Sequence, residues 1–502
     1  MIKNNTADLI SFLEKSVSPY HTTAEAIRLM DESGFTALEQ NKPWKLEKGG
    51  NYYVKCFGTM LIAFHVGCEY VPGEDFRLAA CHVDWPCYYI KPNPEQVSGG
   101  CAKLSIEPYG GMIHNTWLDR PLSAAGMITL KSDNVLAPER RLVDFEKPIL
   151  TIPNLAIHMN RSVNKGVELN PNKDMLPICK SVEQDFNKDG YFVSKLAELA
   201  GVAPEQILSY DLCIYNAEKP VLCGFDEDFL TSPRLDNITS AFAVLYGIVN
   251  CNRAHGVTAA VLFDNEEVGS QTKQGAASTF LADTLERICA ALGNGDKYRE
   301  KVASGFLVSC DNAHAVHPNH PEYADRNHTV RMNGGVVIKY NANQRYTTDA
   351  VSEAIFKSFC DKAGVKTQFY ANRADMAGGG TLGNSGSVGF LFDHKCVFKF
   401  RAAEGVDPEE LELEMIDLGV DEFYSEEDGI TVYAPYESFG AIQKWLDDKG
   451  FEIVSGESVR IPSDVKELDA EGRESVEKLV EKLEEDDDVV NVYHTMKDAD
   501  EE

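Results

Sequence analysis

The sequence lacks a long apolar run. No stretch of its 502 residues approaches the roughly 18–20 apolar residues that a membrane-spanning helix needs, so no membrane is expected among its partners. Residues 1–30 lack the apolar core of a secretory signal and instead mix apolar and acidic residues. The 13 cysteines are scattered and form no C-x-x-C pair, which is typical of reduced thiols. We therefore predict a cytoplasmic protein.

Basic residues are scarce relative to acidic ones. The chain has 48 Lys and Arg against 79 Asp and Glu, a net charge of −31. The excess is uneven, because residues 386–502 hold 34 acidic and 11 basic residues, a net of −23, which leaves −8 for residues 1–385. Binding to phosphate backbones needs clustered Lys and Arg, so this composition makes nucleic acid an unlikely partner. The asymmetry also indicates two modules of different origin.

Most of the chain alternates helical and strand patterns. Apolar residues recur at helical spacing over residues 1–40, and a strand hairpin over 50–66 precedes a short apolar strand over 78–83. Strand-like pieces separated by turn residues fill 88–221, apart from a helix predicted over 181–201. Strands and helices alternate again after this insertion. The order predicts an α/β fold with a mixed sheet and an inserted β-rich region.

After Gly386 the predicted helices and strands follow one another more closely. A strand is predicted over 396–400, a helix over 407–418 and a pair of strands over 422–433. The pattern then predicts, in order, a helix over 437–449, a strand over 451–461, a helix over 469–485 and a strand over 488–494. This compact α/β unit resembles a ferredoxin-like split fold.

Candidate metal ligands stand at predicted strand ends. His82 ends an apolar strand, and Asp84 follows two residues later, where a carboxylate can orient the imidazole of a metal-ligating histidine. An ordinary core histidine is the alternative. Asp236 opens an apolar helix, either as a cap or early-turn carboxylate or as a ligand that bridges two metal ions.

Two further segments carry carboxylates after apolar strands. Asp264, Glu266 and Glu267 crowd within four residues, which indicates either solvation at the surface or a divalent cation. With a cation, one glutamate binds it and the other takes a proton from water. Asp311 follows the next strand, and histidines stand three and six residues after it. Each segment has an ordinary structural explanation, but the four together favour a catalytic metal site.

The four segments occur in the order of a known family. The strings CHVDWP (81–86), SPRLDN (232–237), FDNEEVGS (263–270) and DNAHAVHPN (311–319) resemble signatures of the aspartyl-aminopeptidase-like zinc metallopeptidases. Further matching strings are YGGMIHNTWLDRPLSAAG, LAIHMNRSVN, GGVVIKYNANQRY and NRADMAGGGTLG. The resemblance runs to about Asn384. It implies a catalytic domain formed by residues 1–87 and 222–384, and an inserted β-rich dimerisation domain over 88–221.

The resemblance implies a metal-dependent aminopeptidase with two ions per site. Four residues would bind the ions, namely His82, Asp236, Glu267 and Asp311. Asp236 would bind both ions. Glu266 would be the general base, and Asp84 would orient His82. A water that bridges the ions would attack the peptide bond next to the N-terminal residue. These oxygen and nitrogen ligands suit Zn²⁺, and Mn²⁺ or Co²⁺ could replace it.

The resemblance also implies a cleft for peptide substrates and an assembly. Six residues would line this cleft, one of them from a neighbouring subunit. They are His158, His314, His317, Lys339, Asn341 and Arg345. Lys339 could pair with an Asp or Glu at the peptide N-terminus, or be an ordinary exposed lysine, so the side-chain preference stays open. Family members form homo-oligomers, commonly dodecamers built from dimers, and His158 would act across the dimer interface.

The family pattern stops after Asn384. A member should continue into an apolar strand and then present a histidine in a Ser-Met-His-Ser-like string, the last ligand of the second ion, but only His394 and His494 follow here, in other contexts. Residues 385–502 instead resemble the C-terminal part of the YebC family of transcriptional regulators, without the basic N-terminal domain of that family. Our hypothesis is that recombination or an assembly error joined two genes at this point.

Three functions follow from these patterns. The first is an aminopeptidase, weakened by the loss of the last histidine ligand and holding one or two ions. The second is a catalytically inactive, oligomeric peptidase-like scaffold that binds one ion. The third is a regulatory protein that acts through the acidic YebC-like module, against which the missing basic domain and the negative charge argue.

Overall fold

The computed structural model describes residues 6–371, except 168 and 343, and residues 391–497, except 402–405, 427–428, 469–471, 474–475, 478 and 481–490. The chain divides into two compact units, residues 1–312 and 313–502, each of which is described by itself. Among the described residues, no helix combines the length and the apolar composition that a bilayer span requires. The predicted junction between the two families lies outside the described residues.

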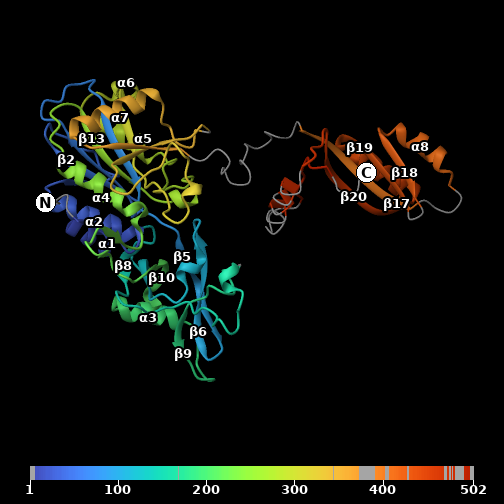
Figure 1. Ribbon diagram of the computed structural model, residues 1–502, viewed down its shortest axis with the longest axis horizontal. Coiled ribbons are helices and arrows are strands. Elements are labelled where there is room, and N and C mark those ends of the chain that lie inside the picture. Colours follow the sequence, from blue (N-terminus) through green and yellow to red (C-terminus); the bar gives the residue numbers. More distant parts are fainter. Residues whose placement is uncertain are drawn as a thin grey trace. The chain divides into compact units, whose positions relative to one another are not determined.

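A mixed six-stranded sheet forms the centre of the first unit (Figure 1). Its strands, in spatial order, are β1 (Thr36–Leu38), β2 (Asn51–Cys56), β3 (Met60–Val66), β13 (Val257–Phe263), β4 (Phe76–His82) and β14 (Phe306–Ser309). The strands β13, β4 and β14 run parallel to one another, whereas β3 is antiparallel to both β2 and β13. Every residue of β3 is buried, as expected for a strand covered on both faces. The predicted hairpin and the strand after it are therefore confirmed.

Helices cover both faces of this sheet. The helices α1 (Thr6–Lys15), α2 (Pro19–Glu32) and α4 (Leu235–Val249) share one apolar core with β3, β4 and β13. On the opposite face, α5 (Phe280–Ala291) packs Leu285 and Ile288 against the other side of the sheet, next to the short helix α6 (Tyr298–Ala303). The side chain of Ser18 accepts a hydrogen bond from the His21 amide and so fixes the start of α2.

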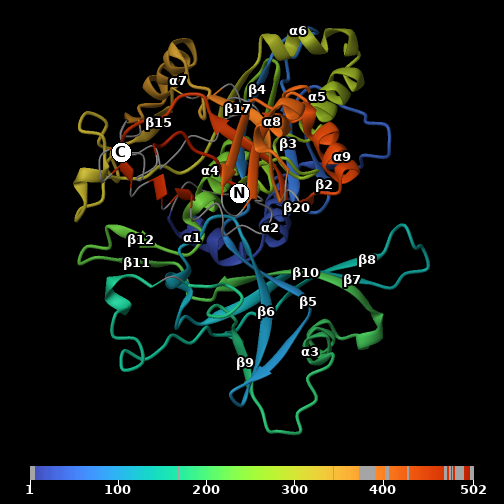
Figure 2. The ribbon, with the colours of Figure 1, turned by 90° about the vertical axis from the view of Figure 1, so that its right-hand side faces the viewer.

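An antiparallel six-stranded sheet fills the insertion (Figure 2). Its strands, in spatial order, are β8 (Glu139–Asp144), β7 (Leu122–Leu130), β10 (Ile207–Asn216), β5 (Cys87–Ser98), β6 (Cys101–Tyr109) and β9 (Ile178–Ser181). The helix α3 (Tyr191–Ala200) buries Phe192 and Leu196 against this sheet. A separate hairpin of β11 (Val221–Cys223) and β12 (Phe229–Thr231) follows.

The helix predicted over 181–201 is shorter in the structure. Its helical part begins at Tyr191, because residues 184–185 and 189–190 form turns before it. Gly190 has a φ of 70°, a left-handed conformation that other residues adopt rarely. The predicted β-rich character of the insertion is otherwise confirmed.

Two strands and a helix of the second unit precede its C-terminal part. The strands β15 (Val336–Tyr340) and β16 (Thr367–Ala371) pair in parallel, and α7 (Ala350–Ala363) lies between them in the sequence. Asp349 caps the start of α7 through a hydrogen bond from the Ser352 amide, and Gly364 ends the helix with a φ of 67°.

The C-terminal part has its own sheet and core. Its elements are β17 (Phe392–Arg401), α8 (Pro408–Ile416), β18 (Glu422–Glu426), β19 (Gly429–Pro435), α9 (Phe439–Lys449) and β20 (Glu452–Pro462). The antiparallel strand order β18-β19-β17-β20 agrees with the predicted ferredoxin-like arrangement. A buried cluster that includes Phe398, Phe400, Val432 and Leu446 lies within this part alone.

Two predicted elements at the C-terminus have different outcomes. Most of the helix predicted over 469–485 lies outside the described residues. The strand predicted over 488–494 is wrong for residues 491–494, which have no strand pairing. The only pairing described nearby is a single bridge between Lys466 and Met496.

Candidate metal centre

The topology gathers the predicted ligands at one edge of the central sheet. His82 is the last residue of β4, Glu266 and Glu267 follow β13, and Asp311 follows β14. These three strands are parallel neighbours, so the segments after them leave the sheet at the same edge. Asp236, the second residue of α4, joins them from the helix that packs over β4 and β13.

His82 lies at the centre of this cluster. Its Nε2 atom is 3.6 Å from Oδ1 of Asp236, 3.6 Å from Oδ1 of Asp311 and 4.0 Å from Oε2 of Glu266. The ligand atoms form two groups within 4.8 Å, His82 with Asp236 and Asp311, and His82 with Glu266 and Glu267. The imidazole is 7% exposed, whereas the side chain of Asp236 is 57% exposed. The cluster therefore has a buried nitrogen at its base and accessible oxygens above it.

Asp84 holds the other side of the imidazole. The Nδ1 atom of His82 is 3.1 Å from the Asp84 carbonyl oxygen and 3.3 Å from its Oδ1. The second carboxylate oxygen, Oδ2, accepts hydrogen bonds from the Tyr109 hydroxyl at 2.7 Å and the Glu267 amide at 3.1 Å. With Nδ1 engaged in this way, Nε2 is turned towards the carboxylates.

The proximity of these groups perturbs their acidity. Burial alone would lower the pKa of His82, but hydrogen bonds to Asp311 and Asp84 and the charges of Asp84 and Glu266 raise it to about 10. Burial raises the pKa of Glu267 and the charge of His82 lowers it. The charges of Asp84, Glu266 and Asp236 raise it further, and the pKa is about 7. Such crowding of carboxylates is costly unless a cation compensates it.

The donor set fits divalent cations. One imidazole nitrogen and several carboxylate oxygens converge within reach of a common ion, and these are the ligand types that Zn²⁺ accepts. Hydrogen bonding of the ligating histidine to a carboxylate behind it is the usual support for such a site.

A cavity borders the cluster. It has a volume of about 980 Å³ and reaches Asp236, and Trp85, Trp117, Arg120 and Arg234 are among the residues that line it. This volume lies at the upper end of the range for small-molecule pockets, which is about 300–1,000 Å³.

The predicted substrate residues lie elsewhere in the chain. His158 is exposed in the loop after Ile152, and it belongs to neither ligand group. The other five, which belong to the second unit, are His314, His317, Lys339, Asn341 and Arg345.

Within that unit, two of these residues lie near one tyrosine. Lys339 stands opposite Tyr370 in the register of β15 and β16, and the ring of His314 is 6.4 Å from the Tyr370 ring. The Lys339 ammonium also lies 5.4 Å from the centre of the Tyr346 ring.

Of the two late histidines, His394 has its contacts away from the ligand cluster. His394 lies in β17, where its ring stacks on Tyr436 at 4.2 Å and its Nε2 is 2.8 Å from the Ser458 hydroxyl. Both contacts are within the C-terminal part. They give His394 a structural role in that sheet.

Two residues next to the cluster have no counterpart in the sequence-based prediction. Tyr109 ends β6 of the insertion, and its hydroxyl joins Asp84 to the Asn265 side chain, which donates to it at 2.9 Å. Gly110 follows with a φ of 70°, and a Cβ atom there would lie only 2.9 Å from Cβ of Glu267. The only sequence signal was their place in the YGG string of the insertion.

Comparison with known proteins decides the family. A family model described as "Aminopeptidase I zinc metalloprotease (M18)" matches residues 12–389, about three-quarters of the chain. The chain belongs to the M18 aminopeptidase family. A "Probable M18 family aminopeptidase 2" of Clostridium novyi (strain NT) is 42% identical over 379 residues, which cover 75% of this chain and 87% of that protein. The predicted identification as a zinc metalloaminopeptidase is therefore confirmed.

Two solved structures have the same fold over most of this chain. The cryo-EM structure of the Ape4 and Nbr1 complex matches with a TM-score of 0.71 and 32% identity, and it covers 75% of this chain and 76% of that one. The structure of the S. cerevisiae mApe1 dodecamer matches with a TM-score of 0.63 and 26% identity, and it covers 72% and 84% of the two chains.

The C-terminal part has a different relationship. A family model described as "TACO1/YebC second and third domain" matches residues 371–496. The two family matches overlap over residues 371–389, which confirms that an M18 sequence is joined to the C-terminal part of a YebC-type sequence.

Proposed function

We propose that this M18 chain removes N-terminal residues from peptides with a pair of divalent ions held at the edge of its central sheet. The observation that carries the proposal is the orientation of His82, whose Nδ1 faces Asp84 while its Nε2 faces three carboxylates. Zn²⁺ is the metal of the family, and Mn²⁺ or Co²⁺ would suit the same donors. When bound, such ions would activate water and polarise the scissile carbonyl.

Each residue of the cluster has a separate task in this proposal. His82, Asp236 and Asp311 would hold one ion, and Asp236 and Glu267 would hold the second. Glu266 would accept the proton of the attacking water at its carboxylate, a step that typically contributes about 10²–10⁴-fold. Asp84 would keep the imidazole in place. The half-exposed carboxylates would leave room for a peptide above the buried histidine.

We propose that peptide binding uses the cavity beside Asp236 and the family cleft residues His158, His314, His317, Lys339, Asn341 and Arg345. Lys339 would favour an acidic N-terminal residue.

We propose three domains, formed by residues 1–87 with 222–384, by residues 88–221 and by residues 385–502. The named dodecameric relative supports a homo-oligomer, in which the insertion would form dimers. The thirteen free cysteines support a cytoplasmic location, and the acidic C-terminal module argues against a nucleic-acid partner.

The test is hydrolysis of aspartyl and leucyl anilides by the metal-supplemented chain. Wild-type turnover that Glu266→Gln abolishes, with metal still bound, would support the proposal. A matched Glu32→Gln variant, which alters a glutamate of α2 outside the cluster, should retain full activity. Turnover that is unchanged in Glu266→Gln would overturn the assigned base.

One observation supports a second candidate function. The string that carries the last ligand of the second ion in this family is missing from the sequence after Asn384. A chain that binds one ion, folds and oligomerises without turnover would be a peptidase-like scaffold. Metal analysis together with the turnover assay distinguishes the two functions, because the scaffold is expected to bind one ion without turnover, whereas the enzyme turns over with one or two ions bound.

A further inference from the structure

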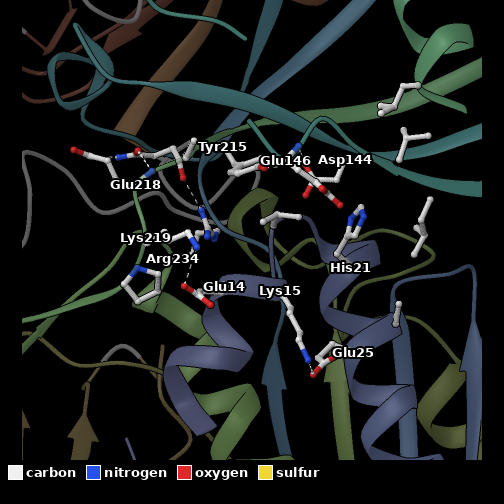
Figure 3. A pocket seen from close by; sticks show the side chains of 18 of the residues that line it. Glu14, Lys15, His21, Glu25, Asp144, Glu146, Tyr215, Glu218, Lys219 and Arg234 are labelled. Atoms are coloured by element: carbon white, nitrogen blue, oxygen red, sulfur yellow. Dashed lines mark hydrogen bonds and ion pairs between the residues drawn. The ribbon is translucent and has the colours of Figure 1, made fainter. Parts of the chain in front are cut away.

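A second cavity lies between the N-terminal helices and the inserted sheet. It has a volume of about 800 Å³. Its walls come from α1 and α2 on one side and from the ends of β8, α3 and β10 on the other, as Figure 3 shows for the labelled residues. The volume is within the usual range for a small-molecule pocket.

Most charges on the walls of this cavity are already paired. Lys15 lies 3.0 Å from Glu25, which also pairs with Arg28, and Lys219 lies 3.6 Å from Glu14. Such pairs neutralise one another and offer little to a ligand. The charges that remain without an opposite partner are therefore the informative ones.

Arg234 is the cation without such a partner. No carboxylate among the described residues lies within ion-pair distance of its guanidinium, which donates instead to the carbonyl oxygens of Asn216 at 3.2 Å and Leu13 at 3.4 Å. Its Nε atom is buried and has no hydrogen-bond partner in the part of the chain that the structure describes. The group lies against the rings of Trp85 and Tyr215, at 5.6 and 5.5 Å. A buried cation held in this way attracts an anion.

Asp144 supplies the opposite charge across the same tyrosine. Its Oδ1 accepts hydrogen bonds from the Tyr215 hydroxyl at 2.7 Å and from the Glu146 amide at 2.9 Å. The described residues donate no hydrogen bond to Oδ2, and no Lys, Arg or His among them pairs with either Asp144 or Glu146. The ring face of Tyr215 therefore lies against a cation without an acidic partner, and its hydroxyl group donates to an acid without a basic partner (Figure 3).

We propose that this cavity binds a small zwitterion, an α-amino acid, with its carboxylate on Arg234 and its ammonium on Asp144. A ligand with both charges satisfies the two unpaired groups at once, whereas a simple anion or cation satisfies one. Free amino acids are the products of an aminopeptidase, so in this respect the inference rests on the proposed function. Arg234 lies two residues before Asp236 and packs on Trp85, next to Asp84.

Calorimetric titration of the full-length chain tests this assignment without any need for turnover. The probes are leucine, isocaproate, which lacks the ammonium, and isopentylamine, which lacks the carboxylate. Leucine should bind saturably and at least about tenfold more tightly than either analogue, the size expected from one lost charge-assisted contact. A His82→Ala variant should bind leucine equally well, because the cavity does not use that residue. Loss of leucine binding in His82→Ala would place the ligand at the metal centre and overturn the proposal.

Three variants locate the bound leucine. Arg234→Met should abolish binding, and Asp144→Asn, which conserves shape and the bond to Tyr215, should weaken leucine at least about tenfold and leave isocaproate unchanged. Arg141→Met is the matched control, since Arg141 lines the cavity but is paired with Glu139. Isocaproate binding as tightly as leucine would mean a simple anion site. No saturable heat, with an oligomer lost in Arg234→Met, would mean that a second copy fills the cavity. Either result overturns the proposal, whether or not the chain hydrolyses peptides.

Discussion

The Nδ1 atom of His82 lies 3.3 Å from Oδ1 of Asp84, and both side chains are buried. The interaction leaves Nε2 as the atom available to a metal ion. We predict that Asp84→Asn lowers metal affinity by about 10–100-fold, the usual cost of losing a carboxylate behind a ligating histidine. Competition with a chromophoric chelator measures this affinity. Asp211→Asn, which alters the partner of Tyr20, is the control and should bind metal normally. Equal affinities in both variants would contradict the assigned role of Asp84.

Removal of metal should destabilise the unit that holds the cluster. An ion present at 100 times its dissociation constant stabilises the folded form by about 2.7 kcal/mol. Scanning calorimetry with and without a chelator should therefore show one transition that shifts to lower temperature. The transition of the C-terminal part should not move, because its core shares no residue with the clusters around the central sheet. A uniform shift of all transitions would argue against this prediction.

The separate core of the C-terminal part gives a mutational test. Phe398 is 1% exposed and packs on Phe439 at 4.7 Å between ring centres. Phe398→Ala should cost about 3–5 kcal/mol in the transition of that part alone. Phe64→Ala, in the central sheet, should lower the other transition by a similar amount. If both variants shift the same transition, the two parts unfold as one.

Acid should weaken the contact between α1 and α2. Burial alone would raise the pKa of Glu25, but hydrogen bonds from Arg28 and Lys15 and their charges outweigh it and lower the pKa below its usual value. Between the two pKa values the folded chain holds fewer protons than the unfolded chain. The stability from Glu25 is therefore present above about pH 4.3, the unfolded value, and lost as the pH falls through the folded value.

Glu25→Gln measures this contribution. The variant should lose about 1.5–3 kcal/mol at pH 7, as expected for a charge-assisted hydrogen bond that is largely buried, and the difference from wild type should shrink below pH 4. Urea unfolding at several pH values gives both numbers. Glu32→Gln is the control, because Glu32 is half exposed and its pair with Arg28 should contribute less than about 1 kcal/mol. A deficit in Glu25→Gln that stays constant down to pH 3 would contradict the assignment.

The sequence predicted the cluster because its members follow apolar strands. His82 ends β4, Glu267 follows β13 and Asp311 follows β14, and parallel neighbours deliver such residues to one edge. The α/β order and the ferredoxin-like module were predictable for a similar reason, since periodicity and turn residues are local signals. The strand expected at 491–494 failed because an apolar run shows β propensity but not whether a partner strand is within reach.

Residues that act through contacts distant in sequence gave no such signal. Tyr109 reaches Asp84 from the inserted sheet, and Arg234 joins α1, β10 and Trp85, yet neither stands in a periodic pattern. Long-range pairing between an insertion and its host domain is set by the three-dimensional packing, and a single sequence does not encode it in any local spacing.

The strand that precedes Asp311 is one of the two edge strands of its sheet. Among the described strands, β14 has four residues, pairs with β4 alone and alternates partly buried with exposed positions. Short edge strands open locally at little cost in free energy, so amide hydrogens there should exchange faster than those of β3. An ion that bridges Asp311 to His82 would fasten this edge to the interior of the sheet. We therefore expect amide exchange in β14 to slow when metal is bound, so that the exchange rate of this strand reports whether the site is occupied.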